Sequence, residues 1–227
     1  MLLTTALTAL LLTAPSPADT GVANLPLVEV PATSGHRAHF AIVISGDGDW
    51  ADFVQELSKR FAAAGVPVVG LKARSYMGRR PTPEQTAVDV ARIIETYASR
   101  WQRPSVVLVG YSRGADWIPF ILNRLPAATR ARVTDASMLG LAARASFQFH
   151  LTDLMRETSR DGDLPLTPEL EKLRGSRLLC MYGSDEVESG CRGADGTLMT
   201  IVGRSGGHHF DRNYDEIART LLGRIGG

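Results

Sequence analysis

A serine between two glycines is the residue of this sequence whose setting most favours chemistry. Gly110-Tyr111-Ser112-Arg113-Gly114 follows the apolar run 106–109 and precedes a stretch with helical spacing. Small residues two before and two after a serine permit a sharp strand-to-helix turn, which exposes the hydroxyl and aims the next amide at an oxyanion. The pattern therefore predicts Ser112 as a nucleophile and the Arg113 amide as an oxyanion donor. The alternative is a glycine-rich turn with an incidental serine.

A serine nucleophile needs a base, and two of the five histidines lie together in Ser205-Gly206-Gly207-His208-His209-Phe210. This segment follows the last predicted strand, where a base that comes after the acid in chain order belongs. We favour His208, because one residue then separates it from Phe210, which can anchor the loop; His209 remains the alternative base and a candidate for substrate contact. Adjacent side chains diverge and no third ligand is evident, so no metal is expected here.

The acid of such a site should follow the next-to-last strand. That strand, 177–182, leads into Gly183-Ser184-Asp185-Glu186. Asp185 is the favoured residue to hold the imidazole in one tautomer and stabilise its charged form, with Glu186 and Glu188 as alternatives.

The only two cysteines, Cys180 and Cys191, flank this acidic segment. They lack the spacing of a zinc site. A disulfide between them would close a short loop around the acid, which requires an oxidising compartment. The alternative is two buried thiols.

A second oxyanion donor is expected from Ser45-Gly46-Asp47-Gly48-Asp49-Trp50, a glycine-rich turn that follows an early strand. The amide of Asp47, or that of Gly48, is the predicted donor. Gly46, Gly48 and Asp49 are expected to contact substrate. The alternation of Asp and Gly also suggests calcium, but the loop is short and lacks the closing glutamate of an EF-hand, so no metal is predicted.

The elements that must position these residues alternate along the chain. Apolar, β-branched runs predict strands over residues 40–44, 66–71, 105–109, 133–139, 177–182 and 198–202. Helical spacing of apolar residues predicts helices over 50–64, 82–97, 115–125 and 214–222. This order predicts a doubly wound, mostly parallel α/β sheet with helices on both faces and ligands at the carboxyl ends of its strands. Residues 161–167, with a glycine and a proline, are expected to form a loop over the site.

Composition and the amino end narrow the class of protein. The chain has 25 Lys and Arg residues and 24 Asp and Glu residues. Its net charge is therefore close to zero, and no overall positive field is present that would attract nucleic acid. Residues 2–14 are only Leu, Thr and Ala, and a Pro-Ser-Pro-Ala segment follows. This predicts a signal peptide over residues 1–18, although no Lys or Arg precedes the apolar run, and a single domain over 25–227. The alternative is an alanine-rich tail on a cytosolic protein.

Several motifs together resemble one family. They are Ser-Gly-Asp-Gly-Asp-Trp, Pro83-Glu84-Gln85-Thr86-Ala87 with Asp89, Gly-Tyr-Ser-Arg-Gly-Ala-Asp, Asn123-Arg124-Leu125-Pro126, Tyr182-Gly183 with Asp185-Glu186 and Cys191, and Gly-Gly-His-His-Phe-Asp. In this order they are similar to the VirJ/AcvB virulence proteins from about residue 39 onward. The resemblance implies an α/β-hydrolase fold, a periplasmic location, a triad of Ser112, Asp185 and His208, and no cofactor. For AcvB-like members it also implies hydrolysis of the aminoacyl ester of lysyl-phosphatidylglycerol, and for VirJ-like members an association with type IV secretion.

The sequence departs from this family after Lys72, where Ser75-Tyr76-Met77-Gly78-Arg79-Arg80 replaces an aromatic-rich stretch, and at Arg113, where the family has an apolar residue.

The sequence thus predicts a serine ester hydrolase that works through an acyl-enzyme. Acidic residues in the early loop, Asp47 and Asp49, together with Asp116, would face a cationic amine. Arg113 or the Arg79-Arg80 pair would face phosphate. A lipid substrate would bring peripheral contact with a membrane. The alternative function is a secretion-associated binding protein on the same scaffold, with other periplasmic proteins as partners.

Overall fold

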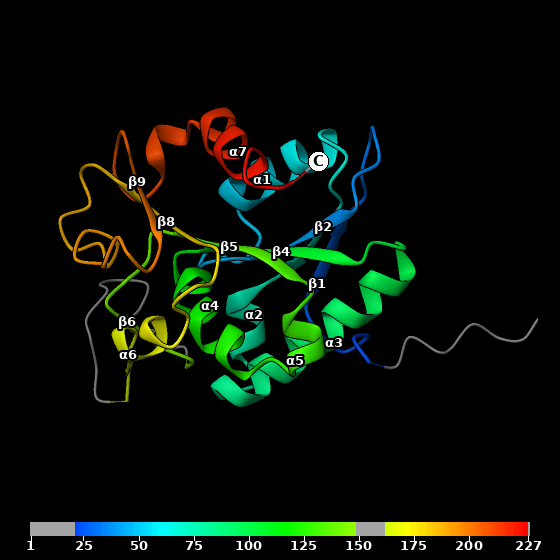
Figure 1. Cartoon of the computed structure of the whole chain (residues 1–227), viewed down its shortest axis with the longest axis horizontal. Helices are drawn as coiled ribbons and strands as arrows, with labels where there is room; N and C mark the ends of the chain where they lie inside the picture. The colour runs from blue at the N-terminus through cyan, green and yellow to red at the C-terminus, as the bar shows by residue number, and fades with distance from the viewer. Residues whose placement is uncertain (1–20, 149–161, 227) are drawn as a thin grey trace, which may run out of the picture.

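A seven-stranded sheet forms the centre of the protein in a computed structural model, which describes residues 21–148 and 162–226 (Figure 1). Its strand order is β1-β3-β2-β4-β5-β8-β9. The strands are β1 (Leu27–Val30), β2 (His39–Ile44), β3 (Val68–Leu71), β4 (Ser105–Tyr111), β5 (Val133–Leu139), β8 (Leu178–Gly183) and β9 (Thr200–Arg204). Only β1 pairs antiparallel within this sheet. The predicted doubly wound, mostly parallel sheet is therefore confirmed.

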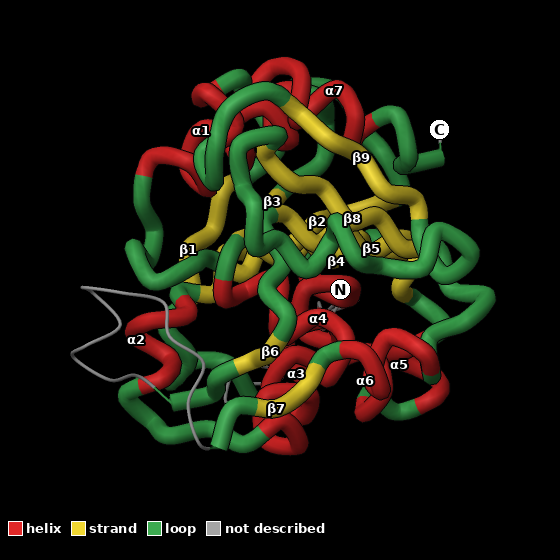
Figure 2. The backbone as a smooth tube through the Cα atoms, turned by 90° about the vertical axis from the view of Figure 1, so that its left-hand side faces the viewer, coloured by secondary structure: helices red, strands yellow, loops and turns green. Residues whose placement is uncertain are grey.

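Helices cover both faces of the sheet, as Figure 1 and the turned view of Figure 2 show. α1 (Asp52–Ala63) and α7 (Tyr214–Leu222) pack on one face; α2 (Ala73–Met77), α3 (Pro83–Arg100), α4 (Arg113–Arg124), α5 (Ala127–Arg130) and α6 (Thr167–Glu171) lie on the other. The central strands are continuous apolar runs, and every residue of β2 is buried. Strands of this kind are stable only when both faces are covered. Two apolar clusters, one on each side of the sheet, form the core.

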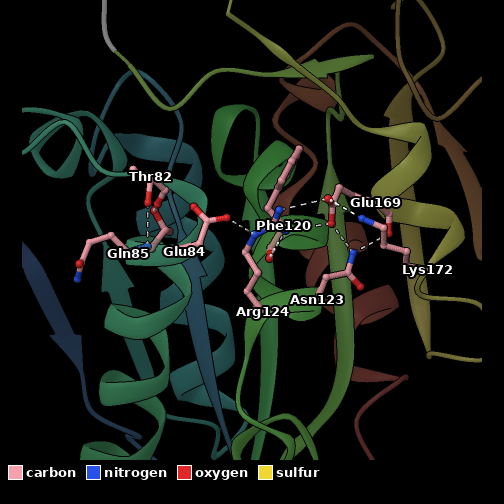
Figure 3. Close-up of polar contacts among 9 residues, drawn as sticks. Thr82, Glu84, Gln85, Phe120, Asn123, Arg124, Glu169 and Lys172 are labelled. Carbon is pink, nitrogen blue, oxygen red and sulfur yellow. Dashed lines mark hydrogen bonds and ion pairs between the residues drawn. The ribbon is translucent and has the colours of Figure 1, made fainter.

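The end of α4 is tied to its neighbours by an ionic cluster, drawn in Figure 3. Arg124 donates to Glu169 of α6 at 3.0 Å and to Glu84 of α3 at 2.9 Å, while Asn123 donates to Glu169 at 2.6 Å. Thr82 accepts from the amide of Gln85 at 3.1 Å and caps the amino terminus of α3. Glu169 is almost fully buried, and its cluster therefore anchors α6 on the helical layer.

The structure adds elements that the sequence analysis did not predict: β1, α2, α5, α6 and a short pair of strands, β6 (Arg144–Ala145) with β7 (Leu164–Pro165). The stretch 161–167, expected to be a loop, contains β7 and the first residue of α6, and Asp161 lies outside the described residues. The predicted signal peptide also lies outside them. Among the residues that the structure does describe, no helix has the length and apolarity needed to cross a membrane.

Candidate active site

The predicted site residues meet at one edge of the sheet because the parallel strands end together. Ile44 of β2 aligns with Gly110 of β4, and Tyr111 with Leu139 of β5. Gly183 of β8 aligns with Arg204 of β9. Loops that follow these strand ends must converge, as expected for an open α/β sheet.

Ser112 lies on the strained turn that the motif predicts. It lies directly before α4 as the cap residue, with φ 54° and ψ −126°, in a region that costs a non-glycine residue free energy. Its amide donates to the carbonyl of Leu139 at 2.8 Å, which fixes the turn on β5. Gly114 makes the turn possible, since a Cβ there would lie 2.2 Å from the carbonyl oxygen of Ile44. Close backbone packing thus holds the serine at the end of β4.

The acid beside the histidine is Glu186, and the prediction of Asp185 is corrected. His208 Nδ1 forms a hydrogen bond with Glu186 Oε1. Asp185 is exposed, and its carboxylate accepts from the Ser184 hydroxyl at 3.1 Å. The reason is the turn after β8: the Glu186 amide donates to Gly183, and the Gly183 amide donates back to Glu186 Oε2 at 2.8 Å. This turn folds the side chain of Glu186 toward His208.

Hydrogen bonding keeps Glu186 ionised. Burial alone would raise the pKa of this carboxyl, but the hydrogen bonds from His208 and the Gly183 amide outweigh burial and lower it. A carboxylate that accepts from Nδ1 selects the imidazole tautomer whose Nε2 can take up a proton. The pair therefore has the electrostatics of a base and its orienting acid.

The two adjacent histidines occupy different environments. His208 lines the cavity with Ser112, and its ring lies against the backbone of Gly140, where a Cβ would approach Cε1 to 2.6 Å. His209 shares a hydrogen bond of 2.6 Å with the Tyr111 hydroxyl. Burial and then the charges of His208 and Arg212 lower the pKa of His209. Only His208 is placed beside both the cavity and an acid. Phe210 is buried, as its predicted anchoring role requires.

The glycine-rich loop after β2 lies against the serine. A Cβ on Gly46 would come 2.9 Å from the Cβ of Ser112. Asp47 and Arg113 form a two-pronged ion pair, with Arg113 Nη2 2.8 Å from Asp47 Oδ2. Asp49 accepts from the amide and the hydroxyl of Ser75, at 3.2 and 2.5 Å. Asp47 and Arg113 line the cavity but neutralise each other in this pair, whereas Asp49 is held by Ser75 and does not line the cavity.

A cavity of about 960 Å³ opens at Ser112 and His208. Its wall is formed by the turn 140–143, the loop 185–189 and parts of the segments 144–146 and 163, together with Asp47, Arg113 and Asp116. The four residues expected to contact substrate, Gly46, Gly48, Asp49 and His209, are not among those that line it.

Acidic side chains dominate the charged part of the cavity wall. Six carboxylates line it against two arginines and His208; the six are Asp47, Asp116, Asp163, Asp185, Glu186 and Glu188. Arg79 and Arg80, which were expected to face phosphate, are not among the residues that line this cavity, and Arg79 donates to the Asn24 carbonyl at 2.8 Å.

Cys180 and Cys191 form the predicted disulfide, with their Cα atoms 5.5 Å apart. Both residues are fully buried. The bridge joins β8 to the end of the loop that carries Glu186, and the amide of Gly190 in that loop donates to the Leu141 carbonyl at 2.7 Å. The acid loop is therefore fixed at its far end to the neighbouring strand ends.

Sequence reasoning missed two contributors to the site, Gly140 and Tyr111, and assigned Asp116 to substrate contact and not to support of the cavity wall. Gly140 supports the imidazole of His208, Tyr111 holds the following histidine, and Asp116 accepts from the Ala142 amide at 2.8 Å, which fixes the turn on the cavity wall. Gly140 directly follows a predicted strand, so its position at the strand end was an available signal. Nothing in the local sequence of Tyr111 or Asp116 indicates those partners.

Solved structures share this architecture. An esterase domain from Rhodothermus marinus matches 89% of this chain and 94% of its own with a TM-score of 0.60 and 14% identity. The match with a thioesterase domain from the curacin biosynthetic pathway covers 86% of this chain and 94% of the thioesterase chain, with a TM-score of 0.60 and 15% identity. The match with an α/β serine hydrolase without a lid from Xanthomonas campestris covers 88% of this chain and 87% of the hydrolase chain, with a TM-score of 0.56 and 13% identity. The chain thus has the α/β-hydrolase fold.

No curated protein sequence matches this chain. The family model described as "Bacterial virulence protein (VirJ)" matches residues 38–226, nearly the whole described part of the chain. This match agrees with the resemblance drawn from the motifs. Because the family model matches most of the chain, the chain belongs to the VirJ family of bacterial virulence proteins.

Proposed function

We propose that the protein is a serine ester hydrolase in which Ser112 is the nucleophile, His208 the base and Glu186 the acid. The observation that carries this proposal is the placement of Ser112 on a strained turn in a cavity shared with His208, whose Nδ1 is bonded to Glu186. A nucleophile, a base and a group that orients the base are the parts that acyl transfer requires.

Acylation and deacylation both pass a proton through the imidazole of His208. Ser112 Oγ attacks the ester carbonyl while Nε2 of His208 takes its proton, and Glu186 stabilises the imidazolium. The amides of Arg113 and Asp47 are the proposed donors to the oxyanion. The imidazolium then gives its proton to the departing alcohol. In the second half, His208 takes a proton from water, which attacks the acyl carbonyl, and returns that proton to Ser112 Oγ as the acid is released.

The substrate we propose is an aminoacyl ester of phosphatidylglycerol, such as lysyl-phosphatidylglycerol. Support comes from the family and from the excess of carboxylates on the cavity wall, since a wall of one sign concentrates ligands of the opposite charge. Asp185 and Glu188 lie exposed at this wall and can attract an ammonium group.

The test of the substrate is release of free lysine from lysyl-phosphatidylglycerol in mixed micelles. The control lipid is the same molecule with both lysine amines acetylated, which keeps the ester and removes the positive charge. We expect faster release from the cationic lipid and none with Ser112→Ala. Equal rates on the two lipids would reject the aminoacyl specificity, and no release from either would reject this substrate class.

We also propose export to the periplasm, followed by contact with the membrane surface that carries the lipid. The Cys180–Cys191 disulfide supports export, because such bonds persist in oxidising compartments. Sequencing the amino terminus of protein recovered from the periplasm tests this: export predicts a start at Asp19, whereas recovery only from the cytosol with residue 1 intact contradicts it.

A further inference from the structure

Arg113 and Asp47 join the two segments that carry the proposed oxyanion donors. Arg113 is the first residue of α4, directly after Ser112, and Asp47 lies in the loop that follows β2. Arg113 Nε bonds Asp47 Oδ1 while Nη2 bonds Oδ2 at 2.8 Å. Their side chains are only 11% and 21% exposed. A two-pronged, mostly buried arginine–carboxylate pair fixes distance and orientation together.

We propose that this ion pair is a positioning device that sets the separation of the two oxyanion donors, so that Arg113 and Asp47 act in catalysis through their side chains as well as their amides. The inference rests on the proposed hydrolase function and deepens it. Donor placement matters because the stabilisation of a developing oxyanion depends on short, preset donor distances.

Backbone contacts hold the base of the loop, whereas side chains tie its tip to the neighbouring helices. The base of the loop touches the elbow at Gly46 and Ser112, and Ile44 meets Gly114. Beyond this base, the loop turns back between Gly46 and Asp49, whose amide donates to Gly46 at 3.1 Å. Asp49 is held on Ser75, on the side of α2. The Asp47–Arg113 pair is the bond that ties the same turn to the nucleophile's own helix.

The ion pair also neutralises the carboxylate of Asp47 beside the proposed oxyanion position. An isolated carboxylate at Asp47 would repel the negative charge that develops on the substrate oxygen, whereas the pair with Arg113 is neutral. Loss of Arg113 is therefore expected to harm catalysis more than loss of Asp47, because it removes the tie and also leaves a negative charge near the donors.

The experiment measures kcat and KM with p-nitrophenyl acetate, a small uncharged ester that neither side chain can bind by charge. The variants are Asp47→Ala, Arg113→Met and the exchanged pair Asp47→Arg with Arg113→Asp. We expect each single substitution to lower kcat about 10- to 100-fold with little change in KM, since a donor held loosely loses part of the 10²- to 10³-fold effect of a donor removed. The exchanged pair should recover kcat relative to both single variants.

Arg124→Met is the matched control. Arg124 is the last residue of α4 and pairs with Glu169 and Glu84 away from the cavity, so its loss should leave kcat unchanged. Melting temperatures of all variants separate loss of fold from loss of catalysis, and a double-mutant cycle of Asp47→Ala with Arg113→Met measures the coupling if the exchanged pair is unstable.

The outcomes distinguish failure of the positioning role from failure of the hydrolase function. Unchanged kcat in folded single variants would overturn the positioning role while wild-type turnover upholds the hydrolase. A change confined to KM for lysyl-phosphatidylglycerol would also overturn it, because the pair would then be reading substrate charge. If wild type neither hydrolyses an ester nor reacts with a serine-directed probe, the hydrolase function fails and this inference fails with it.

Discussion

The nucleophile half and the acid–base half of the site are held in place by different means. Around Ser112, backbone packs on backbone: Gly114 meets Ile44, and Gly46 meets the serine itself. The imidazole of His208 and the acid loop are held mainly by side chains, through the hydrogen bonds of Glu186 and the disulfide at the end of the loop. Glycines in both halves leave no room for an added Cβ, as Gly140 and Gly183 show for the second half, but the second half also depends on particular polar atoms of Glu186 and His208.

The largest effect is expected from the polar atoms of the acid–base half. Glu186→Gln should lower kcat on the order of 10³- to 10⁴-fold, because the neutral amide neither selects the tautomer nor stabilises the imidazolium. The matched control is Asp185→Asn, which should leave kcat for an uncharged ester nearly unchanged, since Asp185 bonds only Ser184 among the described side chains. Steady-state kinetics would contradict this assignment by showing the reverse order.

Loss of the disulfide should cost stability more than catalysis. Cys180→Ser combined with Cys191→Ser frees a loop of sequence separation 11 and is expected to lower the free energy of unfolding by about 3 kcal/mol. Catalysis should fall less, because Glu186 keeps its bond from the Gly183 amide. Urea denaturation and kcat, measured on the same samples, check both parts. An abolished kcat in a folded double variant would show that the bridge places the acid.

The nucleophile half should respond to one added methyl group. Gly114→Ala would place a Cβ 2.2 Å from the Ile44 carbonyl oxygen, so we expect a loss of about 1–3 kcal/mol in stability together with a lower kcat. Gly193→Ala is the control, because a Cβ there meets no atom within 4 Å. Thermal unfolding of the two variants should differ clearly. Equal melting temperatures would mean that the elbow is not closely packed.

The smallest effect is a pH dependence of stability. The pKa of Glu186 is lowered from 4.5, so its stabilising contribution is present above about pH 4.5 and is lost as the pH falls through its lower folded-state pKa. The difference in unfolding free energy between wild type and Glu186→Gln should therefore shrink between about pH 6 and about pH 3. A constant difference over this range would contradict the lowered pKa.

The same contrast explains which parts of the molecule could be predicted from sequence. The strand-to-helix turn at Ser112 was predictable because glycine spacing reports close backbone approach, and the parallel sheet because buried strands are continuous apolar runs. The sequence places an acidic loop after β8, but it does not show whether Asp185 or Glu186 folds back onto Gly183.

The ion pair between Asp47 and Arg113 also could not be predicted from the sequence. Asp47 and Arg113 are separated by 66 residues, and each alone looks like a group that could meet a substrate. Their mutual ion pair follows only from the converging strand ends. The edge strand β1 does not show in the sequence for a related reason: three of its residues are only partly buried and the exposed Glu29 interrupts the apolar run.

The most direct test of the central claim is intact-mass analysis after reaction with a fluorophosphonate, which forms an adduct with an activated serine. The account predicts one adduct on folded wild type, mapped to Ser112 by peptide sequencing, none with Ser112→Ala, and much slower reaction with Glu186→Gln. No adduct on folded wild type, or an adduct that persists in Ser112→Ala, would contradict it.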